Sequence, residues 1–265
     1  MLIREIGSAY SSILRALGLA PEKNLDPETN GEYALLRRLA TLPEISHYDC
    51  AIDVGAHKGE WTVDAMKAFS GTPIAKFFCV EPIDHLAAEL RQTFAGQPNV
   101  EVIEVLMTSE PNPAMTIYNV GGTGRIYPSY RKRGPRASAK GTQKVTTNLQ
   151  VRGATGDELF AGLRPYMVKI DCEGHDLHVL KGLTSVLRNA RPAIQFEYTE
   201  YWIHAGSRLH QANRFLRNLD YRIFRLFPHK LLPIRRGPII DTYEYQNFVA
   251  APAEWKSLAD GTIRL

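Results

Sequence analysis

Seven short apolar runs alternate with segments of helical periodicity between residues 49 and 251. Each run is rich in β-branched or aromatic residues and is bounded by Gly, Pro, Asn or Asp, as strands are. Near-continuous apolarity within a run indicates a strand covered on both faces, as in a parallel sheet. The pattern therefore predicts a doubly wound α/β sheet that binds ligands at the carboxyl ends of its strands. The runs are CAIDV, KFFCVEP, VEVIEVLM, YMVKIDCE, PAIQFEY, YRIFRLF and YQNFVAA.

The segments between these runs predict helices over residues 62–69, 84–94, 177–189 and 210–218. We interpret residues 1–45 as a helical N-terminal extension and residues 46–265 as a single domain. Apolar residues recur at helical spacing within the first twenty positions. We expect that helix to pack on the domain or on a second subunit, which makes a homodimer through it one hypothesis.

One segment, at about 111–156, departs from the alternation. It contains no Asp or Glu, and it is rich in Gly and Tyr around VGGTGRIYPSY. We expect a surface loop or hairpin, which could fold over the open edge of the sheet and suit an acceptor that carries a carboxylate or a phosphate. A solvated loop without such a role is an equal alternative. The cations in the segment are Arg125, Arg131, Lys132, Arg133, Arg136, Lys140, Lys144 and Arg152.

Bulk composition narrows the class of protein. The 265 residues carry a net charge of +4, and 44% of them are hydrophobic, which is typical of a globular protein. The three cysteines lack metal-ligand spacing, and we expect reduced thiols in a cytoplasmic protein. No apolar stretch is long enough to predict a membrane span. The cationic run has few interleaved aromatic residues, which argues against nucleic acid as a partner.

The ends of the first two strands carry residues suited to a nucleoside. Asp53 ends the first strand, and Gly55 and Gly59 follow it in the turn GAHKG. Glycine lets the chain turn sharply and lets a ligand approach the backbone, but a dinucleotide fingerprint would need GxGxxG. Glu81 ends the second strand, where a carboxylate can accept two hydrogen bonds from a ribose diol. These features favour a nucleoside ligand without a pyrophosphate.

Charged residues also gather at the ends of the fourth and fifth strands. Lys169, Asp171 and Glu173 alternate in VKIDCEGHD and therefore share one face of an extended backbone. Glu197 ends the fifth run, AIQFEY. Charges inside apolar strands are costly unless they are paired or functional. We therefore expect several carboxylates to converge on one edge of the sheet.

The motifs AIDVGAHKGEWT, FFCVEP, YMVKIDCEGHDLHVLKG and PAIQFEY, in this order, resemble the FkbM family of S-adenosylmethionine-dependent methyltransferases. The resemblance runs from about residue 50 to about 198. It implies a Rossmann-like, seven-stranded class I methyltransferase sheet with an antiparallel last strand, and O-methylation of a hydroxyl on a sugar, glycan or secondary metabolite. The cofactor-binding residues that it implies are Asp53, Gly55, Ala56, His57, Gly59, Glu81, Pro82, Ile83, Thr108, Ser109 and Asp171.

A hydroxyl acceptor needs a base, because it must lose its proton as the new bond forms. The candidates are Asp171, Glu173, His175 and Glu197. Two other hypotheses stay open. One is a metal-dependent hydrolase that uses Asp171, Glu173 and His175. The other is a non-catalytic module that binds S-adenosylmethionine. For the methyltransferase itself, an auxiliary divalent metal is not expected.

Overall fold

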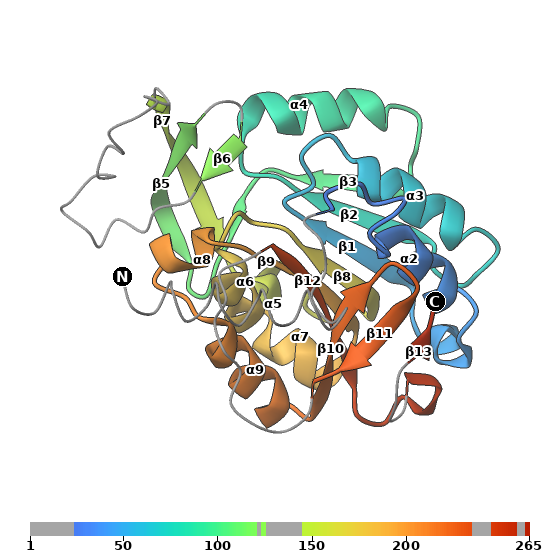
Figure 1. The fold of residues 1–265 in the computed structure, drawn as a ribbon. Helices are drawn as coiled ribbons and strands as arrows, with labels where there is room; N and C mark the ends of the chain where they lie inside the picture. Colours follow the sequence, from blue (N-terminus) through green and yellow to red (C-terminus); the bar gives the residue numbers. More distant parts are fainter. Residues whose placement is uncertain (1–23, 121–122, 126–144, 235–244, 259–262) are drawn as a thin grey trace.

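The computed structural model describes residues 24–120, 123–125, 145–234, 245–258 and 263–265. In this part of the chain a large mixed sheet lies between two layers of helices (Figure 1). Its strands are, in spatial order, β13 (Ile263–Arg264), β11 (Lys230–Pro233), β10 (Tyr221–Phe227), β12 (Gln246–Pro252), β9 (Ala193–Tyr198), β8 (Pro165–Ile170), β1 (Cys50–Val54), β2 (Lys76–Val80) and β3 (Val100–Ile103).

The strand order confirms the predicted doubly wound α/β class. Strands β3, β2, β1, β8 and β9 run parallel, and β12 is inserted antiparallel between β9 and β10. The chain reverses its winding direction between β1 and β8, where such sheets bind ligands. All seven apolar runs contribute a strand. The seven predicted strands form the order β3-β2-β1-β8-β9-β12-β10, and among the described residues β11 and β13 extend this sheet beyond β10.

Alternate residues of the strands pack against different helix layers, which explains the continuous apolar runs. On β1, Ile52 faces one core and Ala51 the other. The first layer consists of α6 (Asp176–Gly182), α7 (Thr184–Asn189) and α9 (Leu209–Asn218). The second consists of α2 (Glu32–Leu39), α3 (Glu60–Ala68) and α4 (Asp84–Thr93). Shorter helices are η1 (Pro43–His47), α5 (Gly156–Leu159), α8 (Tyr201–His204) and η2 (Lys256–Leu258).

The third apolar run divides between two sheets. The chain leaves the large sheet after Ile103, where the Val105 N–H lies 3.2 Å from the Ile103 carbonyl oxygen. It then begins a second sheet with the order β4 (Leu106–Met107), β7 (Val145–Ala154), β5 (Asn112–Val120) and β6 (Thr123–Arg125). The described part of the 111–156 segment is thus a β-hairpin extension. Most of its cations lie outside the described residues: Arg131, Lys132, Arg133, Arg136, Lys140 and Lys144.

The described residues before the first strand share a core with the sheet. Leu35, Leu36 and Leu39 of α2 are fully buried in the layer that also contains α3. The helix predicted at the start of the chain, and with it the predicted dimer contact, lies outside the described residues. Across the described ranges, no helix combines the length and apolarity needed to cross a membrane.

Candidate functional site

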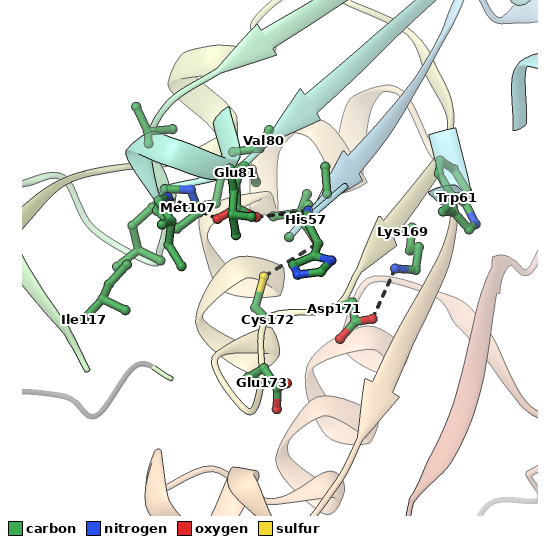
Figure 2. A pocket seen from close by; sticks show the side chains of 18 of the residues that line it. His57, Trp61, Val80, Glu81, Met107, Ile117, Lys169, Asp171, Cys172 and Glu173 are labelled. Atoms are coloured by element: carbon green, nitrogen blue, oxygen red, sulfur yellow. Dashed lines mark hydrogen bonds and ion pairs between the residues drawn. The ribbon is translucent and has the colours of Figure 1, made fainter. Parts of the chain in front are cut away.

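A cavity of about 280 Å³ opens at the carboxyl ends of β1, β2 and β8, beside the switch in winding direction (Figure 2). One wall is mainly apolar and the other is charged. Of the predicted residues, Gly55, Ala56, His57, Glu81, Pro82, Ile83, Asp171 and Glu173 line it. Further lining residues are Val54, Glu60, Trp61, Val80, Leu86, Val105, Leu106, Met107, Ile117, Lys169 and Cys172.

The two glycines of the first turn have different roles. Gly55 lines the cavity with a φ of +81°, and a Cβ there would lie 2.0 Å from the Asp171 carbonyl oxygen. It is therefore required where the ends of β1 and β8 meet. Gly59 has the same φ, but its missing Cβ faces Phe94 and Leu90 of the α4 region. Gly59 does not line the cavity, and its lack of a Cβ permits this close packing.

Glu81 presents its carboxylate to the cavity in a fixed orientation. The His57 backbone N–H donates to Oε2 at 3.0 Å, and the Ile83 N–H donates to Oε1 at 3.1 Å. Burial raises the pKa of Glu81, while these two hydrogen bonds oppose the shift. Each oxygen keeps a lone pair for a ligand hydroxyl. The geometry therefore suits a vicinal diol.

Two non-glycine residues with left-handed backbone lie on the cavity wall. His57 and Glu173 both have a φ of 49°, and they follow β1 and β8 respectively. Such residues are uncommon and concentrate at functional sites, because packing must compensate for their strain. At His57 the strain is coupled to the hydrogen bond that orients Glu81.

The charged wall centres on Lys169, whose side chain is 12% exposed. Its Nζ lies 3.2 Å from Asp171 Oδ2 and 4.0 Å from Asp53 Oδ1 (Figure 2 shows the first contact). Burial disfavours its charge, but Asp171 and Asp53 outweigh this and raise its pKa. Asp53 is 1% exposed and accepts a 2.8 Å hydrogen bond from Thr62, so it lies beneath the cavity and does not line it. Burial raises its pKa.

Further carboxylates stand beside Asp171. Burial, followed by the charges of Asp171, Asp176 and Glu173, raises the pKa of Glu197 well above its usual range. The pKa of Asp176 is likewise raised, first by burial and then by Asp171. The predicted convergence of acidic side chains at this edge is therefore present, although neither Glu197 nor Asp176 lines the cavity.

His175, Thr108 and Ser109 lie outside the cavity. His175 is 1% exposed, its Nε2 is 3.1 Å from Thr108 Oγ1, and its ring stacks on His178 at 4.6 Å. Burial and the neighbouring His178 lower the pKa of His175 to about 3. Ser109 Oγ is 3.4 Å from His178 Nδ1. The structure thus gives His175 the position of a buried side chain that connects the β8 turn to the end of β4.

Sequence reasoning missed most of the apolar wall. Met107 lines the cavity where Thr108 was expected, because β4 bends away from the large sheet. Trp61 lies on α3, which follows the glycine turn, and Leu86 lies on α4, which follows Glu81. Their positions in the first turns of these helices were the signal that could have identified them. Ile117 comes from β5 of the hairpin. The sequence suggested that this segment could fold over the open edge of the sheet, but no local pattern indicates which of its residues reach the cavity.

The described residues contain no group of three or more His, Cys, Asp or Glu side chains placed to hold a metal ion. In particular, His175 is buried against Thr108, away from the cavity that Asp171 and Glu173 line. The metal-hydrolase hypothesis therefore has no support from the geometry.

Together, the β3-β2-β1-β8-β9-β12-β10 order and the antiparallel β12 define an α/β protein with the fold of class I methyltransferases. The family model described as the methyltransferase FkbM domain matches residues 53–223. The chain belongs to this family of S-adenosylmethionine-dependent methyltransferases, as its motifs predicted.

Individual relatives match the chain to different extents. The hexuronic acid methyltransferase AglP of Haloferax volcanii is 42% identical over 74 residues, which cover 26% of this chain and 28% of that protein. The FkbM methyltransferase structure from Methylobacillus flagellatus KT has a TM-score of 0.48 and 16% identity, over 80% of this chain and 47% of that one. A methyltransferase from Aquifex aeolicus has a TM-score of 0.42 and 12% identity, over 91% and 97%.

Proposed function

We propose that the protein is an O-methyltransferase that transfers the methyl group of S-adenosylmethionine to a hydroxyl of an acidic sugar or glycan. The observation that carries this proposal is the cavity itself. It combines a diol-binding carboxylate, an apolar wall and a cluster of carboxylates along one edge.

The residues present fit the cofactor. Glu81 would accept hydrogen bonds from both ribose hydroxyls. Ile83, Leu86 and Met107 offer an apolar surface for the purine. The turn at Gly55 and the carboxylate of Asp171 would face the methionine part. A sulfonium cation is attracted to such carboxylates, because opposite charges interact strongly in a site that excludes most water.

When bound, the cofactor supplies a methyl group already activated by its sulfonium. The protein then has to align the acceptor oxygen with the methyl carbon, and orientation alone contributes several kcal/mol, about 7–11 in favourable cases. As the acceptor oxygen bonds to carbon, its proton passes to a carboxylate. Asp171 and Glu173 at the cavity wall are the proposed proton acceptors. Glu197 ranks below them, because it does not line the cavity.

Two features support an acidic acceptor. The 111–156 segment holds eight cations and no acid. Its described strand β5 contributes Ile117 to the cavity wall and pairs with β7. The partly matching relative from Haloferax volcanii bears the name of a hexuronic acid methyltransferase. A carboxylate-bearing sugar is therefore the acceptor class to test first.

The test is methyl transfer from isotopically labelled S-adenosylmethionine to a matched panel of glucuronides, the corresponding neutral glucosides and phenolic metabolites. We expect a labelled methyl ether on the uronic acid ring, located by mass spectrometry. Reversal of Arg131, Lys132 and Arg133 to Glu should raise KM for the glucuronide and leave KM for the cofactor unchanged. Cofactor binding without transfer to any hydroxyl would contradict the proposal and favour a non-catalytic binding module.

A further inference from the structure

A buried polar row crosses the sheet beneath the cavity. Asp53 on β1, Lys169 on β8 and Gln195 on β9 are partners in register, so their side chains share one face of three adjacent strands. Asp53 and Gln195 are each 1% exposed. Such a row is unusual in a sheet covered by helices, because each buried polar group needs a partner.

The N-terminal segment supplies one of those partners. Glu32 of α2 accepts hydrogen bonds through Oε2 from Gln195 at 2.7 Å and through Oε1 from Asn247 at 3.0 Å. Asn30 also donates to Oε1 at 2.6 Å. Glu32 lies outside the region 53–223 that the family model matches. A carboxylate from another part of the chain thus binds the Gln195 end of the row.

Lys169 is the cation within this arrangement. It faces Asp171 and Asp53 directly, and the charge of Glu32 is close enough to help raise its pKa. Asp53 Oδ1 is buried and accepts no hydrogen bond from the described residues, so the lysine charge is what compensates it. Glu197 and Asp176, from β9 and α6, are further acidic groups whose pKa values are raised by burial and by the charge of Asp171. Without Lys169, no cation of the described residues would stand between Asp53 and Asp171.

We propose that Lys169 is a positioning residue that fixes Asp171 at the cavity wall and sets the net charge felt by the cofactor sulfur, while Glu32 acts on the same site from beneath. This inference rests on the proposed function, because it assumes that the cavity binds S-adenosylmethionine. It also gives α2 a role in cofactor recognition beyond packing. The role is electrostatic, and it can therefore be separated from structural support.

The electrostatic role is distinguished from structural support with two ligands that differ in charge at the sulfur. S-adenosylmethionine carries a sulfonium charge, whereas S-adenosylhomocysteine is neutral there. Loss of packing weakens both ligands by the same factor. A change in cavity charge alters the ratio of their dissociation constants, Kd of S-adenosylhomocysteine over Kd of S-adenosylmethionine. Both constants are measured by calorimetry at pH 8 without an acceptor.

Lys169→Met removes a positive charge and should raise that ratio by at least about threefold, since charges a few ångströms apart interact strongly at a partly buried site. Lys169→Arg keeps the charge and should restore the ratio. Glu32→Gln removes a negative charge and should lower the ratio, so it tests the inference even if Lys169→Met fails to fold. Lys67→Met, at a side chain that is 70% exposed, is the matched control and should leave the ratio unchanged.

An unchanged ratio in both Lys169→Met and Glu32→Gln would overturn the inference, even if both ligands bind more weakly. Absence of binding by the unsubstituted protein would instead contradict the proposed function, and the inference with it. The two failures are therefore distinguishable.

Discussion

The two walls of the cavity are built by different means. The charged wall comes from the end of β8, where the sheet register places Lys169 beside Asp53 and Gln195 and Asp171 directly follows the strand. The apolar wall is assembled from a helix, a short strand and a hairpin that include Leu86, Met107 and Ile117. Register is set by a pattern of period two, whereas the return of a hairpin onto a site has no local pattern. The charged wall was therefore predictable, and the apolar wall was not.

The largest effect is expected where the strand tips meet. Gly55→Ala would place a Cβ 2.0 Å from the Asp171 carbonyl oxygen. We expect a loss of at least about 4 kcal/mol in the free energy of unfolding, measured by urea denaturation, because neither backbone can yield within the sheet. Gly96→Ala is the matched control: its φ is +84°, but no atom lies within 4 Å.

The free energy of unfolding of the control should fall only by the cost of placing alanine in a left-handed backbone conformation, about 1–2 kcal/mol. Equal losses in the two variants would show that the ends of β1 and β8 are not in close contact.

The second prediction concerns the diol-binding carboxylate between the walls. Glu81→Ala should weaken S-adenosylhomocysteine binding by about a hundredfold or more in calorimetry, because two hydrogen bonds to a charged group are lost, each worth about 1.5–3 kcal/mol. The control is Glu101→Ala on neighbouring β3, which removes a carboxylate from a side chain that is 51% exposed. This variant should bind S-adenosylhomocysteine with unchanged affinity. Comparable affinity in both variants would show that the Glu81 carboxylate does not bind the ligand.

The third prediction concerns the contact between His175 and Thr108. His175 connects the β8 turn to Thr108 after β4, and burial lowers its pKa to about 3. An unfolded histidine titrates near 6.5, so below that pH the unfolded state binds the proton and the folded state does not. This histidine therefore leaves the free energy of unfolding unchanged above about pH 6.5. Below that pH it lowers the free energy of unfolding by up to about 1.4 kcal/mol per pH unit as the pH decreases towards 3.

His175→Gln should flatten this acid slope in urea denaturation between pH 7 and 5. His47→Gln, at an exposed position of η1, controls for the loss of a surface imidazole. An identical slope in the unsubstituted protein and in His175→Gln would show that His175 becomes protonated in the folded state.

The smallest effect is expected at the apolar wall. Ile117→Ala should weaken S-adenosylhomocysteine binding about tenfold, because a buried branched side chain contributes about 1.5–3 kcal/mol of apolar contact, shared here between the ligand and the core. Thr116→Ala, on the opposite face of β5, loses only a hydrogen bond from Gln150 and should bind normally. Full affinity in Ile117→Ala would show that the hairpin does not contribute to the cofactor cavity.

The fold and half of the site follow from local patterns. Asp53, Gly55 and Glu81 sit at strand ends that apolar runs and breakers mark directly. Several of the predicted site residues lie outside the cavity for reasons of packing. Gly59 lies against Leu90 and Phe94 of the α4 region. Thr108 is turned towards His175, because the third run leaves the large sheet after Ile103.

Glu32 shows the limit of local reasoning most clearly. It lies in a predicted extension, yet it accepts hydrogen bonds from Gln195 and Asn247, more than 150 residues away in sequence. Contacts at such separation depend on the assembled sheet. Neither the periodicity of α2 nor its composition contains them.

The most direct test of the central claim is a crystal structure with S-adenosylhomocysteine bound. We predict that the ribose hydroxyls contact Glu81, that the adenine packs on Leu86 and Met107, and that the sulfur lies on the side of Asp171. A ligand in the reverse orientation, or one bound away from the ends of β1, β2 and β8, would contradict the division of the cavity into an apolar and a charged wall.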